Sequence, residues 1–385
     1  MSRALVPGDV IGIVGGGQLG RMAAICARRM GFRVAIYTEE AGSPGAQWAD
    51  LTVVGQLDNE EALLKFGRQV DVITYETEHI PLPSMRLLER HCPVYPSPHV
   101  LEVTQHRQLE KEFLASSGLP LPACATIRSF DHLQQEVAKL NRMGVVKTAT
   151  GGYDGKGQWK VGVVPGDVEA AWKAAGGRPL VFEEWVDLAF ECSVIGARAV
   201  DGSMAFYGPV LNDHANHILD VSVCPIVESR MSAALRQQAR DMTEALLRKL
   251  DVVGLLCVEM FVTTDGRLLV NELAPRTHNS GHLTIEGHAT SQFEQIMRIC
   301  AGLPLGSVDQ LRPAAMANLL GDLWSAGPPA WEKMLAHPAA KLHLYGKLDA
   351  KPGRKMGHIT ATAESSESAA KIVTQARRDL AAGAR

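Results

Sequence analysis

The sequence predicts an α/β protein with more than one domain, and three features indicate this class. Short apolar segments alternate with helical ones over the first 75 residues, a rhythm typical of a parallel sheet. Two later apolar segments flank Asp265-Gly266, a dipeptide typical of hairpin turns, and predict an antiparallel strand pair. At 385 residues, the chain is long enough for two or three domains with cores of their own.

The first block of the chain contains the predicted parallel sheet. Its expected elements are strands at residues 10–14, 34–37 and 70–75 and a helix at residues 18–30. A proline-rich connection at residues 93–98 follows, and proline interrupts strand pairing because it has no N–H group. We therefore expect a first domain over residues 1–104.

The rest of the chain divides into a large second block, residues 105–300, and a smaller third block, residues 301–385. The second block has predicted helices at residues 109–116, 231–250 and 292–300, strands at 180–183 and 191–197, and the hairpin strands 255–262 and 268–272. Within it, residues of about 123–186 are expected to form a flap subdomain. The third block has apolar segments at residues 316–320 and 341–347, a break at Pro328-Pro329, and a terminal helix from about Glu367.

Two carboxylates in the predicted hairpin indicate a metal site. Glu259 and Glu272 are equidistant from Asp265-Gly266, so a two-residue turn there places them directly opposite each other. Facing carboxylates in an apolar ladder repel each other unless a positive charge lies between them. Mg²⁺ prefers oxygen ligands and commonly binds one or two carboxylates together with substrate phosphates. The hairpin therefore predicts a magnesium site in an enzyme that handles a nucleotide, whereas a slipped register would leave one Glu in solvent.

The segment after the second hairpin strand, NELAPRTHNSGH at residues 271–282, is rich in hydrogen-bonding side chains. Polar loops at strand ends commonly carry binding sites. His278 and His282 have the spacing of some zinc sites. Zinc is disfavoured, because Pro275 and Gly281 bracket the segment and no glutamate follows His278.

A glycine-rich segment in the second block predicts a flap over phosphates. It follows the apolar residues before Lys147 and reads GGYDGKGQ at residues 151–158, with Lys156 inside it. Glycines let a backbone turn its amides toward an anion, and lysines supply positive charge. The segment is not a Walker A loop, since no GKS or GKT closes it. A flexible glycine hairpin is the alternative from this segment alone.

A second glycine loop, at the N-terminus, leaves another enzyme class open. Gly15, Gly17 and Gly20 form a GxGxxG pattern between a predicted strand and helix, and Glu39 and Glu40 follow the next strand. This pattern is typical of dinucleotide folds and would fit an NAD-dependent dehydrogenase. A dehydrogenase has no use for the facing carboxylates or the second glycine flap. A glycine loop at a helix N-terminus binds other phosphates equally well.

Composition indicates a reduced, cytoplasmic protein. The formal charge of −3 gives no reason to expect nucleic acid or an anionic membrane as a partner. Seven scattered cysteines without a CxxC motif are typical of reduced thiols rather than of a disulfide framework or zinc site. The N-terminal residues do not have the pattern of a signal peptide, and no apolar run reaches about 18 residues. We therefore expect neither secretion nor membrane insertion.

Four motifs together resemble one enzyme family. GGGQLGRM at residues 15–22, TGGYDGKGQ at 150–158, NELAPRTHNSGH at 271–282 and PGRKMGH at 352–358 resemble the 5-(carboxyamino)imidazole ribonucleotide synthases of purine biosynthesis, in the ATP-grasp superfamily. The resemblance implies an ATP-grasp fold with an N-terminal Rossmann-like pre-ATP-grasp domain and a small C-terminal domain. It also implies ATP- and bicarbonate-dependent carboxylation of aminoimidazole ribonucleotide through carboxyphosphate, ATP with two Mg²⁺ ions, and a homodimer.

The resemblance also implies a set of site residues. For ATP these are Arg107, Lys147, Gly152, Tyr153, Asp154, Gly155, Lys156, Gly157, Gln158, Glu183, Glu184, Trp185, Val186, Glu191, His214, Asn271 and Glu272. The ribonucleotide and bicarbonate are assigned to Gln18, Leu19, Glu76, Arg276, His278, Lys347 and Arg354. Arg276, His278 and Asp154 are the catalytic candidates, and Glu259 and Glu272 the metal ligands.

Three other functions remain possible at this stage. The formate-dependent glycinamide ribonucleotide transformylase of the same pathway shares the architecture and the ATP chemistry. The NAD-dependent dehydrogenase has support from the N-terminal glycine loop. A nucleotide-sensing or scaffold protein on an ATP-grasp fold is disfavoured, since such a protein would be expected to have lost Glu259, Glu272 or Lys147.

Overall fold

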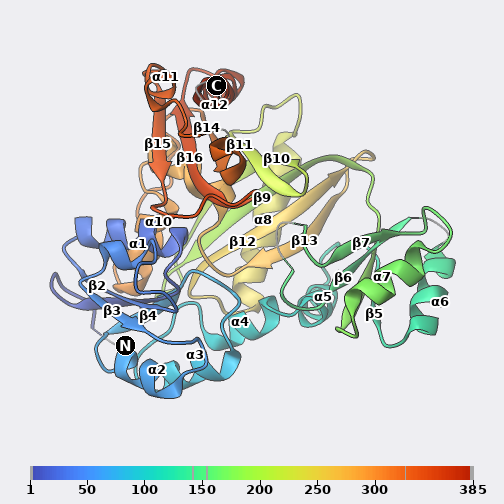
Figure 1. Cartoon of the computed structure of the whole chain (residues 1–385), viewed down its shortest axis with the longest axis horizontal. Helices are drawn as coiled ribbons and strands as arrows, with labels where there is room; N and C mark the ends of the chain where they lie inside the picture. Colours follow the sequence, from blue (N-terminus) through green and yellow to red (C-terminus); the bar gives the residue numbers. More distant parts are fainter. Residues whose placement is uncertain (1–2, 141–142, 153–154, 326, 382–385) are drawn as a thin grey trace.

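The computed structural model describes residues 3–140, 143–152, 155–325 and 327–381. In this part of the chain the strands form three sheets, and Figure 1 shows the chain as three lobes around a centre. The N-terminal sheet lies at the lower left, the flap sheet at the right, and the C-terminal strands at the top of Figure 1.

The N-terminal sheet is parallel throughout, as the sequence predicts, and its strand order is β3-β2-β1-β4. Its elements are β1 (Val10–Val14), α1 (Gln18–Arg29), β2 (Arg33–Thr38), η1 (Ala46–Trp48), β3 (Leu51–Val54), α2 (Glu60–Gly67), β4 (Val72–Tyr75) and α3 (Leu82–Glu89). Ile11, Ile13, Val34 and Ile36 are buried and form the core beneath α1. Strand β3 is an additional edge strand, which the sequence analysis did not predict.

A separate four-stranded sheet carries the glycine-rich flap. Helices α4 (Pro98–Thr104) and α5 (Arg107–Ser116) lead into it, and its elements are β5 (Cys124–Ile127), α6 (Phe130–Leu140), β6 (Gly144–Thr148), β7 (Gln158–Val161), α7 (Asp167–Ala175) and β8 (Leu180–Glu184). The strand order is β5-β8-β6-β7, and neighbouring strands are antiparallel. The flap connects β6 to β7, with Lys147 paired to Gln158 at its base.

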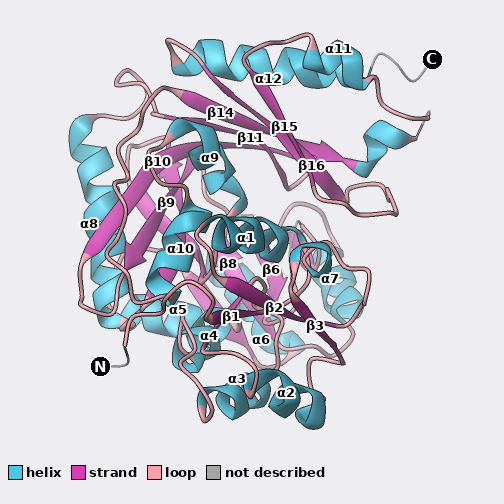
Figure 2. Cartoon of the chain, turned by 90° about the vertical axis from the view of Figure 1, so that its left-hand side faces the viewer, coloured by secondary structure: helices cyan, strands magenta, loops and turns pink. Residues whose placement is uncertain are grey.

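The third sheet has eight strands in the order β13-β12-β9-β10-β11-β14-β16-β15. Its strands are β9 (Leu188–Arg198), β10 (Met204–Ala215), β11 (Ile218–Cys224), β12 (Gly254–Thr263), β13 (Leu268–Ala274), β14 (Ala314–Leu320), β15 (Ala340–Leu344) and β16 (Lys355–Thr362). Its helices are α8 (Ala233–Lys249), η2 (Asn279–Leu283), α9 (Thr284–Gly287), α10 (Gln292–Cys300), η3 (Gly321–Trp324), α11 (Trp331–Leu335) and α12 (Ser366–Ala381). The C-terminal strands therefore extend the central sheet, and Figure 2 shows α12 lying over them.

The hairpin of β12 and β13 has the predicted facing pair but a different turn. Glu259 pairs with Glu272, so the predicted register at the carboxylates is confirmed. The predicted two-residue turn is wrong, because Thr263 N donates to Arg267 O across a three-residue loop. Met260 accordingly pairs with Val270, and a bulge then shifts the register by one residue. The loop and the bulge offset each other, with Asn271 as the extra residue of the bulge.

Candidate active site

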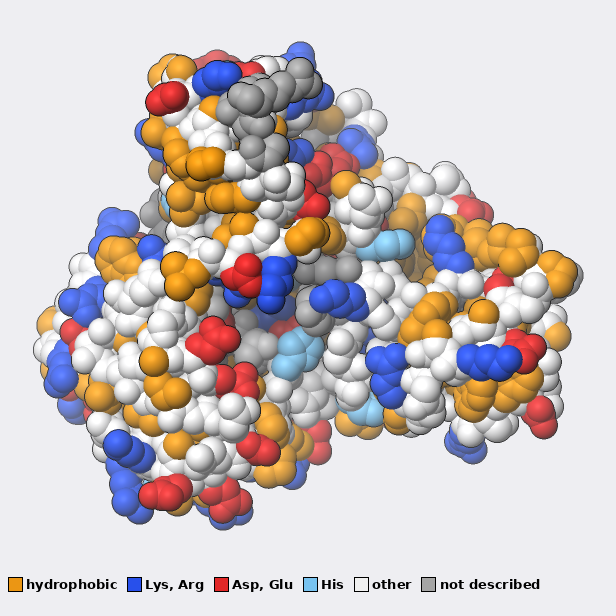
Figure 3. Space-filling view, in the orientation of Figure 1, with side chains coloured by type: hydrophobic (Ala, Val, Ile, Leu, Met, Phe, Trp, Pro, Cys, Tyr) orange, Lys and Arg blue, Asp and Glu red, His pale blue; other side chains and the backbone are white. Residues whose placement is uncertain are grey.

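A cleft of about 1570 Å³ lies where the three lobes meet. Figure 3 shows this hollow at the centre of the molecule, with acidic, basic and histidine side chains around it. Residues from all three lobes line it, so it can bring together ligands held by different parts of the chain. Such clefts between structural units are common positions for substrate sites.

Most of the site residues expected from the sequence line this cleft. They are Gln18, Leu19, Glu76, Arg107, Lys147, Gly152, Gly155, Lys156, Gln158, Glu183, Glu184, Trp185, Val186, Glu191, His214, Glu259, Asn271, Glu272, Arg276, His278, Lys347 and Arg354. Among the expected residues that the structure describes, Gly157 is outside the lining, and its carbonyl accepts a hydrogen bond from Thr148 N at the base of the flap. Tyr153 and Asp154 lie outside the described residues.

The facing carboxylates each have a cation of the protein beside them. His278 Nε2 lies 2.7 Å from Glu259 Oε1, and Arg107 Nη1 lies 3.2 Å from Glu272 Oε2. Burial disfavours the charged forms of His278 and Glu259. Cys257 and Glu259 nevertheless raise the pKa of His278 above its ordinary value, and His278 lowers the pKa of Glu259. The two carboxylates, on adjacent strands and with Glu272 partly exposed to the cleft, offer the oxygen ligands that suit Mg²⁺.

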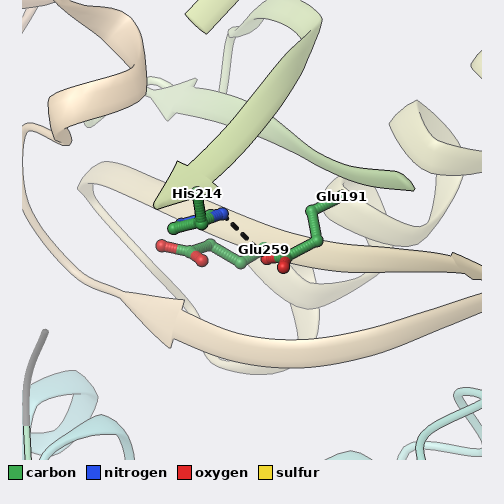
Figure 4. A group of neighbouring side chains, drawn as sticks. All are labelled: Glu191, His214 and Glu259. Atoms are coloured by element: carbon green, nitrogen blue, oxygen red, sulfur yellow. Dashed lines mark ion pairs between the residues drawn. The ribbon is translucent and has the colours of Figure 1, made fainter. Parts of the chain in front are cut away.

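Glu191 and His214 lie next to Glu259 and enlarge this group (Figure 4). One ligand atom from each of the three lies within 4.8 Å of the others, and His214 Nδ1 is 3.3 Å from Glu191 Oε2. Burial raises the pKa of Glu191 to about 7, and repulsion from Glu259 and Glu272 adds to the shift. Two carboxylates and one imidazole can also hold a divalent cation. The sequence analysis assigned Glu191 and His214 to the nucleotide and did not foresee that they lie next to Glu259.

A buried network of charges surrounds the expected phosphate-binding lysine. Lys147 Nζ is 2.8 Å from Glu183 Oε2, and Lys111 Nζ is 3.5 Å from Glu183 Oε1. Burial lowers the pKa of Lys147, while Glu183 counters that effect. The Glu183 side chain thus pairs with two lysines. Lys111 was missed, although its position four residues after Arg107 on one helix face was a readable signal.

Trp185 and Lys160 form one wall of the cleft beside β8. Lys160 Nζ lies 4.1 Å from the centre of the Trp185 ring, a cation–π contact. Both residues line the cleft. The sequence analysis named Trp185 and missed Lys160, which follows the flap on β7.

The N-terminal glycine loop binds a carboxylate of the protein itself. Glu76 accepts hydrogen bonds from Gly17 N and from Gly20 N, the latter at 2.7 Å. A Cβ on Gly15 would lie 2.4 Å from Glu76 Cγ, so this glycine makes room for the side chain. Two amides of this glycine loop, those of Gly17 and Gly20, are therefore bonded to Glu76. The dehydrogenase alternative is wrong, because the pyrophosphate of NAD would need these amides.

The remaining expected cations have partners within the chain. The Arg276 guanidinium binds the Glu78 carboxylate through two bonds, one of them 2.8 Å from Nη2 to Oε1. Lys347 Nζ donates to Lys355 O and Arg354 Nη1 to Asp349 O, each at 2.8 Å. Lys347 and Arg354 thus lie in one loop between β15 and β16 and line the same side of the cleft.

Comparison with protein families accounts for most of the chain. The ATP-grasp domain matches residues 112–293, the ribonucleotide synthetase preATP-grasp domain matches residues 9–105, and the phosphoribosylaminoimidazole carboxylase C-terminal domain matches residues 314–372. The N5-carboxyaminoimidazole ribonucleotide synthase of Bacillus subtilis (strain 168) is 41% identical over 364 residues, which cover 94% of this chain and 93% of the relative. The chain belongs to the N5-carboxyaminoimidazole ribonucleotide synthase family. It is therefore an ATP-dependent ligase of the ATP-grasp type, as the motifs predicted.

Solved structures of the family agree in fold. A crystal structure of an N5-carboxyaminoimidazole ribonucleotide synthetase in an ADP complex superposes with a TM-score of 0.92 at 38% identity and covers 98% of each chain. The Aspergillus clavatus enzyme in complex with ADP and 5-aminoimidazole ribonucleotide gives a TM-score of 0.89 at 30% identity, covering 98% of this chain and 99% of that one.

The family assignment decides among the remaining functions. The family's activity is ATP-dependent carboxylation of 5-aminoimidazole ribonucleotide in purine biosynthesis, which confirms the prediction over the transformylase and scaffold alternatives. In the described part of the chain, no helix is long and apolar enough to cross a membrane.

Proposed function

We propose that ATP, bicarbonate and 5-aminoimidazole ribonucleotide react together in the central cleft. ATP first phosphorylates bicarbonate, giving ADP and carboxyphosphate. The amine of the ribonucleotide then takes the carboxyl group: a C–N bond forms, the C–O bond to phosphate breaks, and the amine loses a proton. The observation that carries this proposal is the placing of Glu259 and Glu272 in the same cleft as Lys147, Lys347 and Arg354.

The ATP half of the cleft lies between the flap sheet and the central sheet. Lys147 and Arg107 hold phosphate oxygens, and the flap closes over them with its amides. The backbone of residues 183–186 reads the adenine edge beside Trp185, and Glu191 accepts hydrogen bonds from the ribose hydroxyls. These residues line one continuous cleft, which supports the assignment.

Two Mg²⁺ ions on Glu259 and Glu272 fit the donor set. When bound, they would neutralise charge on the β- and γ-phosphates during transfer. Within the protein, His278 and Arg107 supply positive charge next to the same carboxylates. Asn271 of β13 lines the cleft and completes the ATP contacts in this proposal.

The ribonucleotide half lies between the N-terminal lobe and the C-terminal strands. Lys347 and Arg354 are seven residues apart around the Pro352-Gly353 turn and can both bind one phosphate. Gln18, Leu19 and Glu76 contact the rest of the ribonucleotide. Arg276 and His278 act on bicarbonate, with the fork of Arg276 oriented by Glu78. His278 Nδ1 lies 2.8 Å from Ser280 Oγ, which fixes the orientation of its ring.

Further proposals concern the whole protein. We propose domains over residues 1–104, 105–300 and 301–385, with a flap subdomain at about 123–186. We also propose a cytoplasmic homodimer. Gel filtration with light scattering tests the dimer.

One experiment tests the function directly. ADP release is measured with aminoimidazole ribonucleotide present or omitted and with bicarbonate varied. We expect release to require bicarbonate and to rise with the ribonucleotide. Release that is independent of both substrates would contradict the proposed function.

A further inference from the structure

Helix α5 contacts three consecutive residues of β13, the edge strand of the central sheet. Lys111 Nζ donates to Asn271 O at 2.6 Å, and Glu110 Oε1 accepts from Leu273 N at 2.6 Å. Between these anchor points, Arg107 of the same helix binds the Glu272 carboxylate. Glu110 and Lys111 are 2% and 3% exposed, so both contacts are shielded from water.

These contacts are made at the bulge that gives the hairpin its register. On the turn side of Asn271, Met260 of β12 pairs with Val270 of β13. On the other side of Asn271, Glu259 pairs with Glu272. Continuing the turn-side register without the bulge would place Asn271 opposite Glu259. A one-residue slip sends every side chain to the other face of a sheet. The bulge is therefore what brings Glu272 opposite Glu259.

We propose that Glu110 and Lys111 are positioning residues that hold this bulge and so set the place of the Glu272 carboxylate. An edge strand has unpaired N–H and C=O groups on its open side. The two side chains bind one such carbonyl and one such amide, on either side of Glu272. This inference rests on the metal role proposed for Glu272.

Lys111 has a second contact that connects the metal strand with the flap sheet. Its ammonium group lies 3.5 Å from Glu183 on β8, and Glu183 in turn holds Lys147 on β6. One buried charge thus links Asn271, next to the metal carboxylate, to the partner of the phosphate-binding lysine. Buried charges are costly to desolvate, and a well-packed apolar residue would serve stability at least as well. A role in placing the site explains why charged groups occupy these positions.

The test compares Lys111→Met and Glu110→Met with the wild type. Each removes a bond to the bulge without adding charge. We measure the Mg²⁺ concentration for half-maximal ADP release, kcat, and KM for ATP and for aminoimidazole ribonucleotide. Groups that orient metal ligands typically change metal affinity or activity by about 10- to 100-fold. We expect a rise of about 10-fold or more in the Mg²⁺ requirement, with KM for the ribonucleotide unchanged.

Three further variants make the result specific. Lys111→Arg keeps the charge and the donors, and should restore the Mg²⁺ requirement toward the wild-type value. Glu112→Gln changes an exposed carboxylate on the same helix and should leave all four constants unchanged. Glu272→Gln tests the underlying assignment: an unchanged Mg²⁺ requirement in that variant would overturn the metal role itself.

The positioning inference fails separately if Glu272→Gln raises the Mg²⁺ requirement while Lys111→Met and Glu110→Met do not. It is also overturned if the two Met variants lower only the melting temperature. Loss of folding in both Met variants would also overturn the inference, because Glu110 and Lys111 would then contribute to stability rather than to placing Glu272.

Discussion

Three buried or half-buried carboxylates of the site have a basic partner at short range. Glu259 has His278, Glu272 has Arg107, and Glu183 has Lys147. Removing one member of such a pair leaves an uncompensated charge, which costs more than the pair itself contributes. The sequence predicted the facing carboxylates, because their spacing from one turn is readable. It did not reveal the counter-charges, since these come from segments far away in the chain.

Glu272→Gln should lower turnover strongly and leave the fold intact. The substitution removes the charge of a proposed metal ligand and one partner of Arg107, with almost no change in volume. Substitution of a group that only supports a metal ligand typically lowers metal affinity or activity by about 10- to 100-fold. Loss of a ligand itself should therefore lower kcat by about 100-fold or more. Steady-state ADP release measures the loss, and circular dichroism checks the fold. Near-normal activity at ordinary Mg²⁺ would contradict the metal assignment.

Arg354→Ala should weaken binding of the ribonucleotide and leave ATP binding almost unchanged. Charge-assisted hydrogen bonds contribute about 1.5 to 3 kcal/mol, which corresponds to a rise of roughly 10- to 100-fold in the apparent KM. Saturation curves for both substrates provide the measurement. Arg28→Ala is the control, because Arg28 is paired with Asp50 outside the cleft lining. A loss confined to ATP would place Arg354 in the other half of the cleft.

At the scale of elements, the prediction succeeded where apolar segments are short and clearly bounded. β1, β8 and α10 lie where the pattern placed them. Strand β10 was missed because Gly208-Pro209 in its centre resembles a turn. The register shifts between Tyr207 and Val210, so the proline occupies an irregular position where no ladder N–H is needed. As a result, His214 near the end of β10 could be named only through the family resemblance and not placed.

The next prediction concerns the flap, which we propose closes over the phosphates. Gly155 has a φ of +78°, and an added Cβ would lie 2.6 Å from Cβ of His217 in the turn after β10. Gly155→Ala should therefore hinder closure of the flap against that turn, at a cost of about 1 kcal/mol or more from φ alone. If closure shields carboxyphosphate, water will reach the intermediate more often. The ratio of ADP formed to ribonucleotide carboxylated should then rise above unity.

Gly176→Ala is the matched control for this prediction. Gly176 has a φ of +62° and open space around its Cα, and it lies outside the cleft lining. The strain is similar, but no flap contact is involved, so the ratio should stay near unity. A Gly155→Ala enzyme that is slower with an unchanged ratio would show that the flap does not guard the intermediate.

At the scale of the whole molecule, the family resemblance predicted the architecture, while local patterns alone did not. Nothing in the segments at residues 316–320 and 341–347 indicates that β14 would pair with β11 and extend the central sheet. That pairing depends on contacts between distant segments. It brings the last residues of two motifs together, with the rings of His282 and His358 centred 4.7 Å apart.

The histidine pair makes the stability of the molecule depend on pH. His282 and His358 are buried, and burial lowers the pKa of both well below the usual range. Below about pH 6.5 the unfolded chain binds protons at these positions and the folded chain does not. The free energy of unfolding therefore decreases as the pH is lowered, by roughly 1.4 kcal/mol per pH unit for each histidine. His358→Gln should make this slope shallower, although loss of the Tyr345 hydrogen bond lowers stability at every pH. Urea titrations between about pH 5 and 7.5 measure the slope, with exposed His99→Gln as the control. Equal slopes in wild type and His358→Gln would show that the buried histidine does not couple folding to pH.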